Sequence, residues 1–112
     1  MDIRDRNENG VSVVSPVGSV DAITAPELSE YLQGLVDGGH TRLVVDMTGI
    51  DYTSSAGLRV FLGMVKETRA AGGDIRLAST QPAVYKVLEL SGFTSILKTF
   101  NDTPAAVASF AE

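Results

Sequence analysis

Residues 43–62 read LVVDMTGIDYTSSAGLRVFL, and this stretch contains the two elements that indicate the fold class. Leu43–Met47 is a short apolar run, typical of a buried strand in a parallel sheet. Residues 48–53 are predicted to form a loop. From Ser55 to about Ala71 the apolar residues recur at helical spacing, with Leu58, Phe61, Leu62, Val65 and Thr68 on the inner side. A strand followed by a helix is the basic unit of an α/β domain.

Upstream of this unit, the sequence predicts a strand and then a helix. Residues 11–18 are rich in β-branched residues and end in turn residues, and a strand starting near Ile3 could pair with them through a turn at residues 9–10. Residues 24–27 have the Thr-x-x-Glu spacing of a capping box, in which both side chains accept hydrogen bonds from backbone N–H groups. The helix that follows is expected to end at Gly38-Gly39.

Downstream of residue 71, strands and helices continue to alternate. Residues 75–78 and 96–100 are predicted strands, and helices are predicted after Thr80 and after residues 101–104. From the first clear strand onward the order is β-α-β-α-β-α-β-α, which implies a largely parallel sheet with right-handed crossovers. A length of 112 residues suits one domain, so we expect a single α/β domain over residues 1–112.

Composition and charge narrow the classes of function. The formal net charge is −5, which argues against direct binding to nucleic acid or to anionic lipid, since both need clustered Lys and Arg. The chain has no cysteine, which excludes disulfides, thiolate catalysis and Cys-based metal sites. No apolar run approaches the ~20 residues that span a bilayer, and the first residues lack the apolar core of a signal peptide. The expectation is a cytoplasmic protein that does not enter a membrane.

The polar residues indicate neither a catalytic triad nor a metal site. His40 is the only histidine and lies in a predicted turn, so it is interpreted as a solvated loop residue. Asp21, Asp46 and Asp51 lie near predicted element ends without calcium-loop spacing, and are interpreted as turn, cap or surface residues. The glycines form no phosphate-binding loop. We therefore expect no catalytic residue, no metal and no cofactor.

The three consecutive hydroxyl residues Thr53, Ser54 and Ser55 meet the start of the central helix. Capping explains one hydroxyl at such a position, because Ser and Thr are favoured there, but capping does not need three. The small residues Ala56 and Gly57 leave the first turn uncrowded, so a bulky partner could approach the hydroxyls. From the residues alone, capping is the simpler interpretation and a functional hydroxyl is the alternative.

The same helix has an unusually wide apolar stripe. Val60 and Met64 lie at its edge, away from Leu62. The stripe is wider than one packed face needs. Part of it could stay exposed beside the hydroxyls as a docking surface, and a helix packed more deeply than average explains it equally well.

Three segments, in order, resemble the STAS domain family, and more narrowly the anti-sigma factor antagonists of bacterial partner-switching systems. They are TSSAGLRV at residues 53–60, preceded by VVDM at 44–47, then GSVDAITAPEL at 18–28, and the stretch from Pro82 to Phe93. The resemblance implies a single STAS-like α/β domain, with a mixed sheet of 4–5 strands packed with about four helices.

The resemblance also implies a regulatory binding protein rather than an enzyme. The family's phosphoserine lies two residues before the Gly-Leu pair, which here is Ser55. Ser54 stands where many members have Asp and is the runner-up acceptor, and Ala56 replaces the second Ser. The implied partners are an anti-sigma factor that is also a serine kinase of the GHKL ATPase type, and a PP2C-type phosphatase. With the apolar stripe, the predicted partner surface comprises Asp21, Thr53, Ser54, Ser55, Ala56, Gly57, Arg59, Val60 and Met64.

Two other functions compete with this prediction. The chain could be a STAS binding module of a transport or lipid-trafficking complex that acts without phosphorylation. It could also be a small hydrolase that uses Ser55, although no histidine lies near Ser55 in the sequence.

Overall fold

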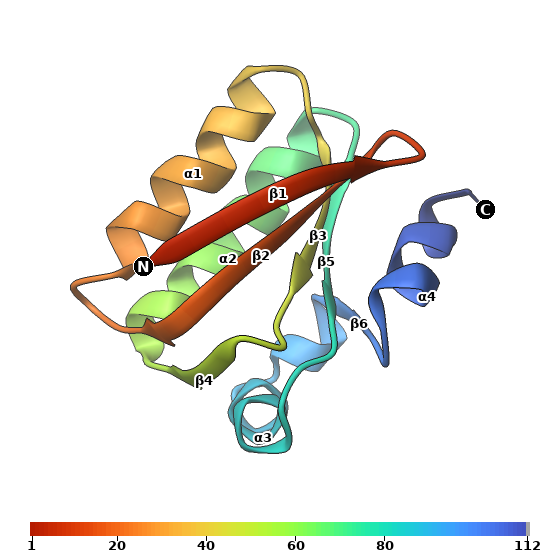
Figure 1. Ribbon diagram of the computed structural model, residues 1–112. Helices are drawn as coiled ribbons and strands as arrows, with labels where there is room; N and C mark the ends of the chain where they lie inside the picture. Colours follow the sequence, from red (N-terminus) through yellow and green to blue (C-terminus); the bar gives the residue numbers. More distant parts are fainter. Residues whose placement is uncertain (112) are drawn as a thin grey trace.

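The computed structural model describes residues 1–111, in which the chain forms one sheet flanked by helices (Figure 1). The strands of the described residues are β1 (Asp2–Glu8), β2 (Val11–Val20), β3 (Arg42–Asp46), β4 (Ile50–Thr53), β5 (Asp74–Ala78) and β6 (Lys98–Phe100). The helices are α1 (Ala25–Asp37), α2 (Ser55–Ala70), α3 (Pro82–Leu90) and α4 (Thr103–Ala108), with short 3-10 helices at Phe93–Ser95 and Ser109–Ala111.

The sheet is mixed, as predicted, and its order is β1-β2-β3-β5-β6, with β4 paired to β2 beside this path. Among the strands of residues 1–111, only β1 runs antiparallel to its neighbour, and its pairing with β2 confirms the strand expected to begin near Ile3. The pairs β2–β3, β2–β4, β3–β5 and β5–β6 are all parallel. The carboxyl ends of β2, β3, β4, β5 and β6 therefore lie at one edge of the sheet.

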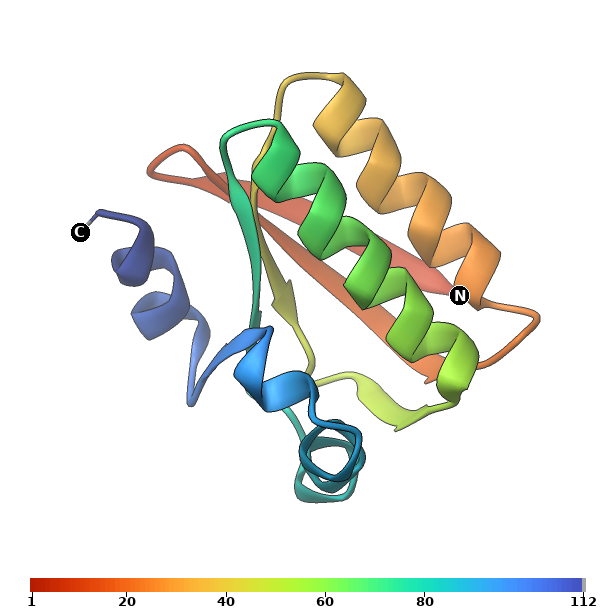
Figure 2. The ribbon, with the colours of Figure 1, turned by 180° about the vertical axis from the view of Figure 1, so that it is seen from behind.

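Helices cover the two faces of the sheet unequally. The helices α1 and α2 lie side by side on one face, and α4 lies on the other (Figure 2). Successive strand residues point to opposite faces, so Val14 and Val45 pack toward α1 and α2, while Val13 and Val44 pack toward α4. Phe61 of α2 is fully buried in the larger core. Burial of a side chain of this size contributes about 1.5–3 kcal/mol.

Two local predictions are wrong, and each has a physical reason. Residues 48–53 were expected to be a loop, but Ile50–Thr53 pairs with β2 as β4, with a register shift between Gly18 and Ser19. A four-residue strand with two exposed central residues carries no clear period in the sequence. The strand predicted for residues 96–100 begins only at Lys98, because Ile96 and Leu97 donate backbone bonds to Phe93.

The predicted capping box at residues 24–27 is also absent. The Thr24 hydroxyl donates to the Ser19 carbonyl at 2.7 Å, and Glu27 accepts from the Met1 ammonium group at 3.1 Å. Thr24 has helical backbone angles (φ −89°, ψ −22°), whereas side-chain capping needs an extended residue.

Among the described residues, no helix combines the length and the apolar character needed to cross a membrane.

Candidate functional site

The predicted site lies where two parallel strands end side by side. Val20 at the end of β2 pairs with Thr53 at the end of β4, and the Ser54 N–H donates to the Val20 carbonyl at 2.8 Å. The residues that follow these strand ends are Asp21 and Ser54. The starts of α1 and α2 therefore lie next to each other (Figure 1). The pairing of the strand ends brings Asp21 close to the hydroxyl segment, although more than thirty residues separate them in sequence.

The three hydroxyl residues occupy three different environments. Thr53 is buried, and its hydroxyl donates to the Ser54 carbonyl at 3.2 Å. Ser54 is the N-cap of α2: its backbone is extended, and its hydroxyl accepts from the Ala56 N–H at 3.2 Å. Ser55 is the first residue of α2 and is exposed, and its hydroxyl makes no hydrogen bond within residues 1–111. Capping thus uses Ser54 and leaves Ser55 open to solvent.

Gly57 allows the first turn of α2 to lie directly on the strand ends. A Cβ atom added at Gly57 would collide with the Thr53 hydroxyl and would lie 2.8 Å from Val20 Cγ1. Both of these side chains are short, β-branched and buried, so neither can swing away at low cost. The backbone that carries Ser55 is therefore held firmly against β2 and β4.

Asp21 organises the loop between β2 and α1. Its carboxylate accepts from the backbone N–H groups of Thr24 at 3.0 Å and Ile23 at 2.9 Å. These bonds, that from Thr24 foremost, lower the pKa of Asp21 below its ordinary value of 3.8, because they favour the charged form. At neutral pH, Asp21 is a fixed negative charge beside the start of α2.

The other predicted partner residues divide into surface and core. Arg59 is exposed, and Ala56 and Val60 are half-buried. Met64 is only 3% exposed and belongs to the main core, so its side chain cannot line a docking surface, contrary to the prediction. The wide stripe exists because α2 packs against α1 as well as against the sheet, which is the deeper packing considered as the alternative. Thr53 and Gly57 are likewise buried and support the surface from below.

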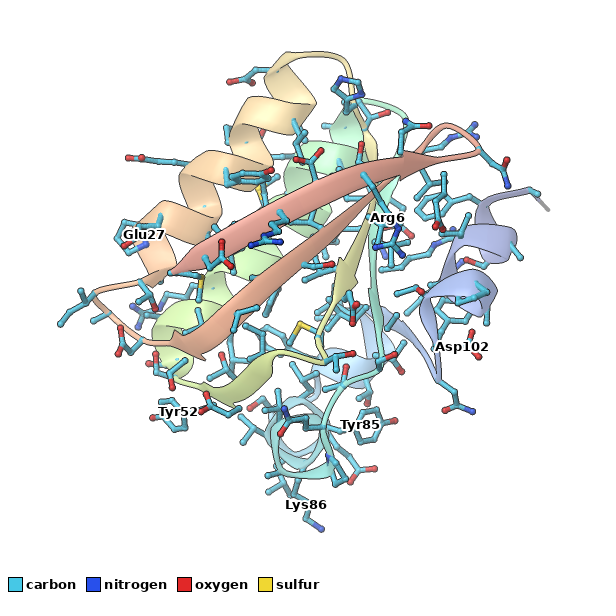
Figure 3. The ribbon with its side chains drawn as sticks, in the orientation of Figure 1. Arg6, Glu27, Tyr52, Tyr85, Lys86 and Asp102 are labelled. Atoms are coloured by element: carbon cyan, nitrogen blue, oxygen red, sulfur yellow. The ribbon has the colours of Figure 1, made fainter. Side chains whose placement is uncertain are left out.

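Sequence reasoning missed two exposed apolar residues at this edge. Ile23 is 82% exposed in the loop after β2, and Tyr52 is 54% exposed on β4 (Figure 3). Exposed apolar patches rimmed by polar residues mark interaction sites, and these two side chains are the apolar candidates at this edge. Because side chains alternate along a strand, Tyr52 points to the face opposite that of the buried Thr53. This signal is visible only once residues 50–53 are known to form a strand. We call Asp21, Ile23, Tyr52, Ser55 and Arg59 the candidate docking surface, shortened below to the docking surface.

Within the described residues, the other predicted polar side chains lie away from Ser55 or are engaged elsewhere. His40 follows the carboxyl end of α1, whereas Ser55 lies near the start of α1, and a helix of 13 residues is about 20 Å long. Asp46 accepts from the hydroxyl and N–H of Thr48, and Asp51 accepts from the Ser19 hydroxyl. Within residues 1–111, no group of three or more His, Cys, Asp or Glu side chains could hold a metal ion.

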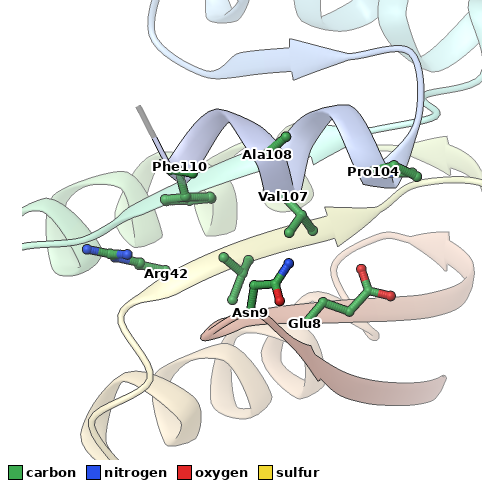
Figure 4. A pocket seen from close by; sticks show the side chains of 9 residues that line it. Glu8, Asn9, Arg42, Pro104, Val107, Ala108 and Phe110 are labelled. Atoms are coloured by element: carbon green, nitrogen blue, oxygen red, sulfur yellow. The ribbon is translucent and has the colours of Figure 1, made fainter.

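A cavity of about 330 Å³ lies elsewhere, between α4 and the β1–β2 hairpin (Figure 4). Val11, Val107 and Phe110 contribute apolar walls, and Glu8 and Arg42 contribute charged ones. None of the predicted site residues lines this cavity, so it is separate from the docking surface.

Comparisons with known proteins identify relatives and solved structures that match almost the whole chain. The family model described as the STAS domain matches residues 2–106. BtrV of Bordetella bronchiseptica, which carries the description of an anti-sigma factor antagonist, is 39% identical over 102 residues, covering 91% of this chain and 88% of BtrV.

Two solved structures have the same fold at low sequence identity. The crystal structure of an anti-sigma factor antagonist protein of Thermotoga maritima has a TM-score of 0.93 at 17% identity, over 98% of this chain and 95% of that one. The phosphorylated form of the Bacillus cell fate determinant SpoIIAA has a TM-score of 0.73 at 17% identity, over 97% and 99% of the two chains. The matched segments, the mixed sheet and the family model agree, and this chain belongs to the STAS domain family.

Proposed function

We propose that this chain is an anti-sigma factor antagonist that is switched by phosphorylation of Ser55. The unmodified form binds an anti-sigma factor, which is also a serine kinase of the GHKL ATPase type, and thereby releases a sigma factor or another target. Phosphorylation abolishes this binding, and a PP2C-type phosphatase restores it. The observation that carries the proposal is the exposed, unbonded hydroxyl of Ser55 on a firmly held helix start. The 39% sequence identity with BtrV, over 91% of this chain, supports it.

Ser55 suits a phosphoryl acceptor because the kinase can supply most of the chemistry. Phosphoryl transfer depends chiefly on positioning and on charge stabilisation by the kinase and its metal ion. The γ-phosphoryl group of ATP passes to the Ser55 oxygen, the hydroxyl loses its proton, and ADP leaves. This chain supplies only an accessible oxygen on a rigid element.

Ser55 is favoured over Ser54 by its surroundings. The Ser54 hydroxyl accepts the Ala56 N–H bond and caps the helix, so transfer to Ser54 would disturb that cap. Ser55 carries no such bond within the described residues.

The phosphate acts at the interface and not by melting the helix. It adds about −1.5 to −2 charges at pH 7. Negative charge at a helix N-terminus is favourable by about 0.3–1 kcal/mol when exposed, so α2 stays folded. In the complex, the same charge would be buried against the partner near Asp21, where it costs desolvation and repulsion. A loss of about 3–4 kcal/mol corresponds to a few hundredfold in affinity.

The proposal is tested with the cognate kinase, ATP and four forms of the protein. Intact mass should show one added phosphate on the wild type and on Ser54→Ala, and none on Ser55→Ala. Equal phosphorylation of Ser55→Ala and the wild type would refute the assignment. By calorimetry, Ser55→Asp should bind the kinase at least tenfold more weakly than the wild type. The loss of affinity should be smaller than that caused by phosphate, since Asp carries less charge than phosphate. A complex of unchanged affinity after phosphorylation would favour a binding module that works without this switch.

A further inference from the structure

Among the described residues, Arg42 and Arg59 are the arginines without an ion pair, and Arg59 is the one that lies on the docking surface. Arg4, Arg6, Arg69 and Arg76 each form an ion pair with a carboxylate. Arg59 is exposed on α2 and forms no ion pair within residues 1–111. Its guanidinium is therefore an unused cation on the docking surface.

The position of Arg59 on α2 explains why it has no partner along the helix. Neighbours on a helix surface are three or four residues apart, with about 5–6 Å between their Cβ atoms. At these spacings from Arg59 lie Ser55, Ala56, Leu62 and Gly63, none of which carries a charge. Ser55, one turn before Arg59, is the only one of the four that can acquire a charge by modification.

We propose that Arg59 is the internal counter-ion of a phosphate on Ser55. This inference rests on the proposed function, because it assumes that Ser55 is the residue modified. The acidic group lies N-terminal to the basic one at i, i+4 spacing, which is the better of the two orders. Arg and phosphate form charge-assisted and often bidentate hydrogen bonds. Phosphorylation then adds a negative charge and also withdraws the cation that the docking surface otherwise offers to a partner.

Two carboxylates lie on the neighbouring segments: Asp51 on β4, which accepts from the Ser19 hydroxyl, and Asp21, which directly follows β2. Asp21 follows the strand end that binds the Ser54 N–H, and its carboxylate is held by backbone N–H groups of its own loop. Asp21 therefore opposes ionisation of the phosphate, while Arg59 favours it. Variants of Arg59 leave the Asp21 effect unchanged, so the contribution of Arg59 can be isolated.

The test uses the full chain with phosphoserine installed at position 55 during translation, and follows the ³¹P resonance of the phosphate against pH. The second pKa of phosphoserine is about 6 without partners. We expect Arg59→Gln to raise this pKa by about 0.2–0.4 units relative to the wild type, the size of an exposed helical pair. Arg59→Lys, which keeps the charge, should restore most of the wild-type value.

Lys66→Gln is the matched control. Lys66 is exposed on the same helix and its loss changes the net charge equally, but it lies eleven residues after Ser55, or about 16 Å along the axis. This exceeds the screening length of about 8 Å at 0.15 M salt, so the phosphate should titrate as in the wild type. Equal titration of Arg59→Gln and Lys66→Gln would overturn the inference, as would failure of Arg59→Lys to restore the pKa.

This experiment is independent of the kinase. If no kinase modifies Ser55, the proposed function fails while the ³¹P result still decides whether the pair forms. If the kinase modifies Ser55 but the Arg59 variant titrates like the wild type, only the counter-ion inference fails.

Discussion

The helices α1 and α2 begin next to each other at the same edge of the sheet, yet their starts use polar side chains differently. At the start of α1, the Asp21 carboxylate and the Thr24 hydroxyl are both engaged by the backbone. At the start of α2, Ser54 alone provides the cap and Ser55 has no internal bond within the described residues. At the start of α1, backbone N–H groups therefore hold the Asp21 carboxylate as a fixed negative charge. The start of α2 presents an exposed hydroxyl on an equally rigid support, and a group held on a rigid element is well placed for recognition.

The largest expected effect on stability comes from changing Gly57, where α2 lies close to the strand ends. Gly57→Ala should lower the free energy of unfolding by about 1–2 kcal/mol, because overpacking against Thr53 and Val20 outweighs the gain in helix propensity. Urea denaturation measures this difference. The control is Gly63→Ala on the same helix, where a Cβ meets nothing within 4 Å and should stabilise the protein by up to about 1 kcal/mol. Equal effects of the two substitutions would show that α2 does not press on the strand ends.

The cap of α2 should have the next largest effect. Ser54→Ala removes the acceptor of the Ala56 N–H and should cost about 1 kcal/mol of unfolding free energy. Ser54→Asp, which keeps a good capping acceptor, should remain close to the wild type in the same urea titration. If Ser54→Ala were as stable as the wild type, Ser54 would not be the cap, and its hydroxyl would be as free as that of Ser55.

The hydrogen bonds to Asp21 in the loop before α1 should make the stability of the protein depend on pH. The pKa of Asp21 is lowered in the folded protein, so its contribution to stability is present above its unfolded pKa and is lost as pH falls through the folded pKa. Asp21→Asn should therefore lower the Tm at pH 7, with a difference from the wild type that shrinks as the pH falls below the ordinary Asp pKa of 3.8. A Tm difference that stayed constant down to acid pH would contradict this assignment.

The smallest effect on stability should come from the residue with the largest proposed effect on function. Ser55→Ala should change the free energy of unfolding by no more than about 0.5 kcal/mol, since Ser55 is exposed and its hydroxyl has no internal partner among the described residues. Urea denaturation beside Ser54→Ala checks this. A loss as large as that of Ser54→Ala would mean that both start residues serve the fold.

Much of the fold follows from local patterns that survive packing. The apolar run at residues 43–47 and the helical period from Ser55 onward correspond to β3 and α2, and Gly38 ends α1 as expected. The strand β4 could not be predicted, because its four residues are held by pairing with the end of β2 and have no strong pattern of their own. The capping box at Thr24 failed for a related reason, since the loop geometry set by Asp21 turns Thr24 toward Ser19.

The sequence by itself determined the α/β class, the family resemblance and the hydroxyl segment, because all three depend on residues that are close in the chain. Only the tertiary structure decided which hydroxyl is free, since the Ser54 cap and the Ser55 exposure depend on how α2 meets β2 and β4. It also removed Met64 from the predicted docking surface. The helix α2 contacts both α1 and the sheet, and these two contacts bury the wide apolar stripe that packing against the sheet alone would leave partly exposed. Burial depends on which elements surround a helix, and that arrangement follows from the packing of the whole chain.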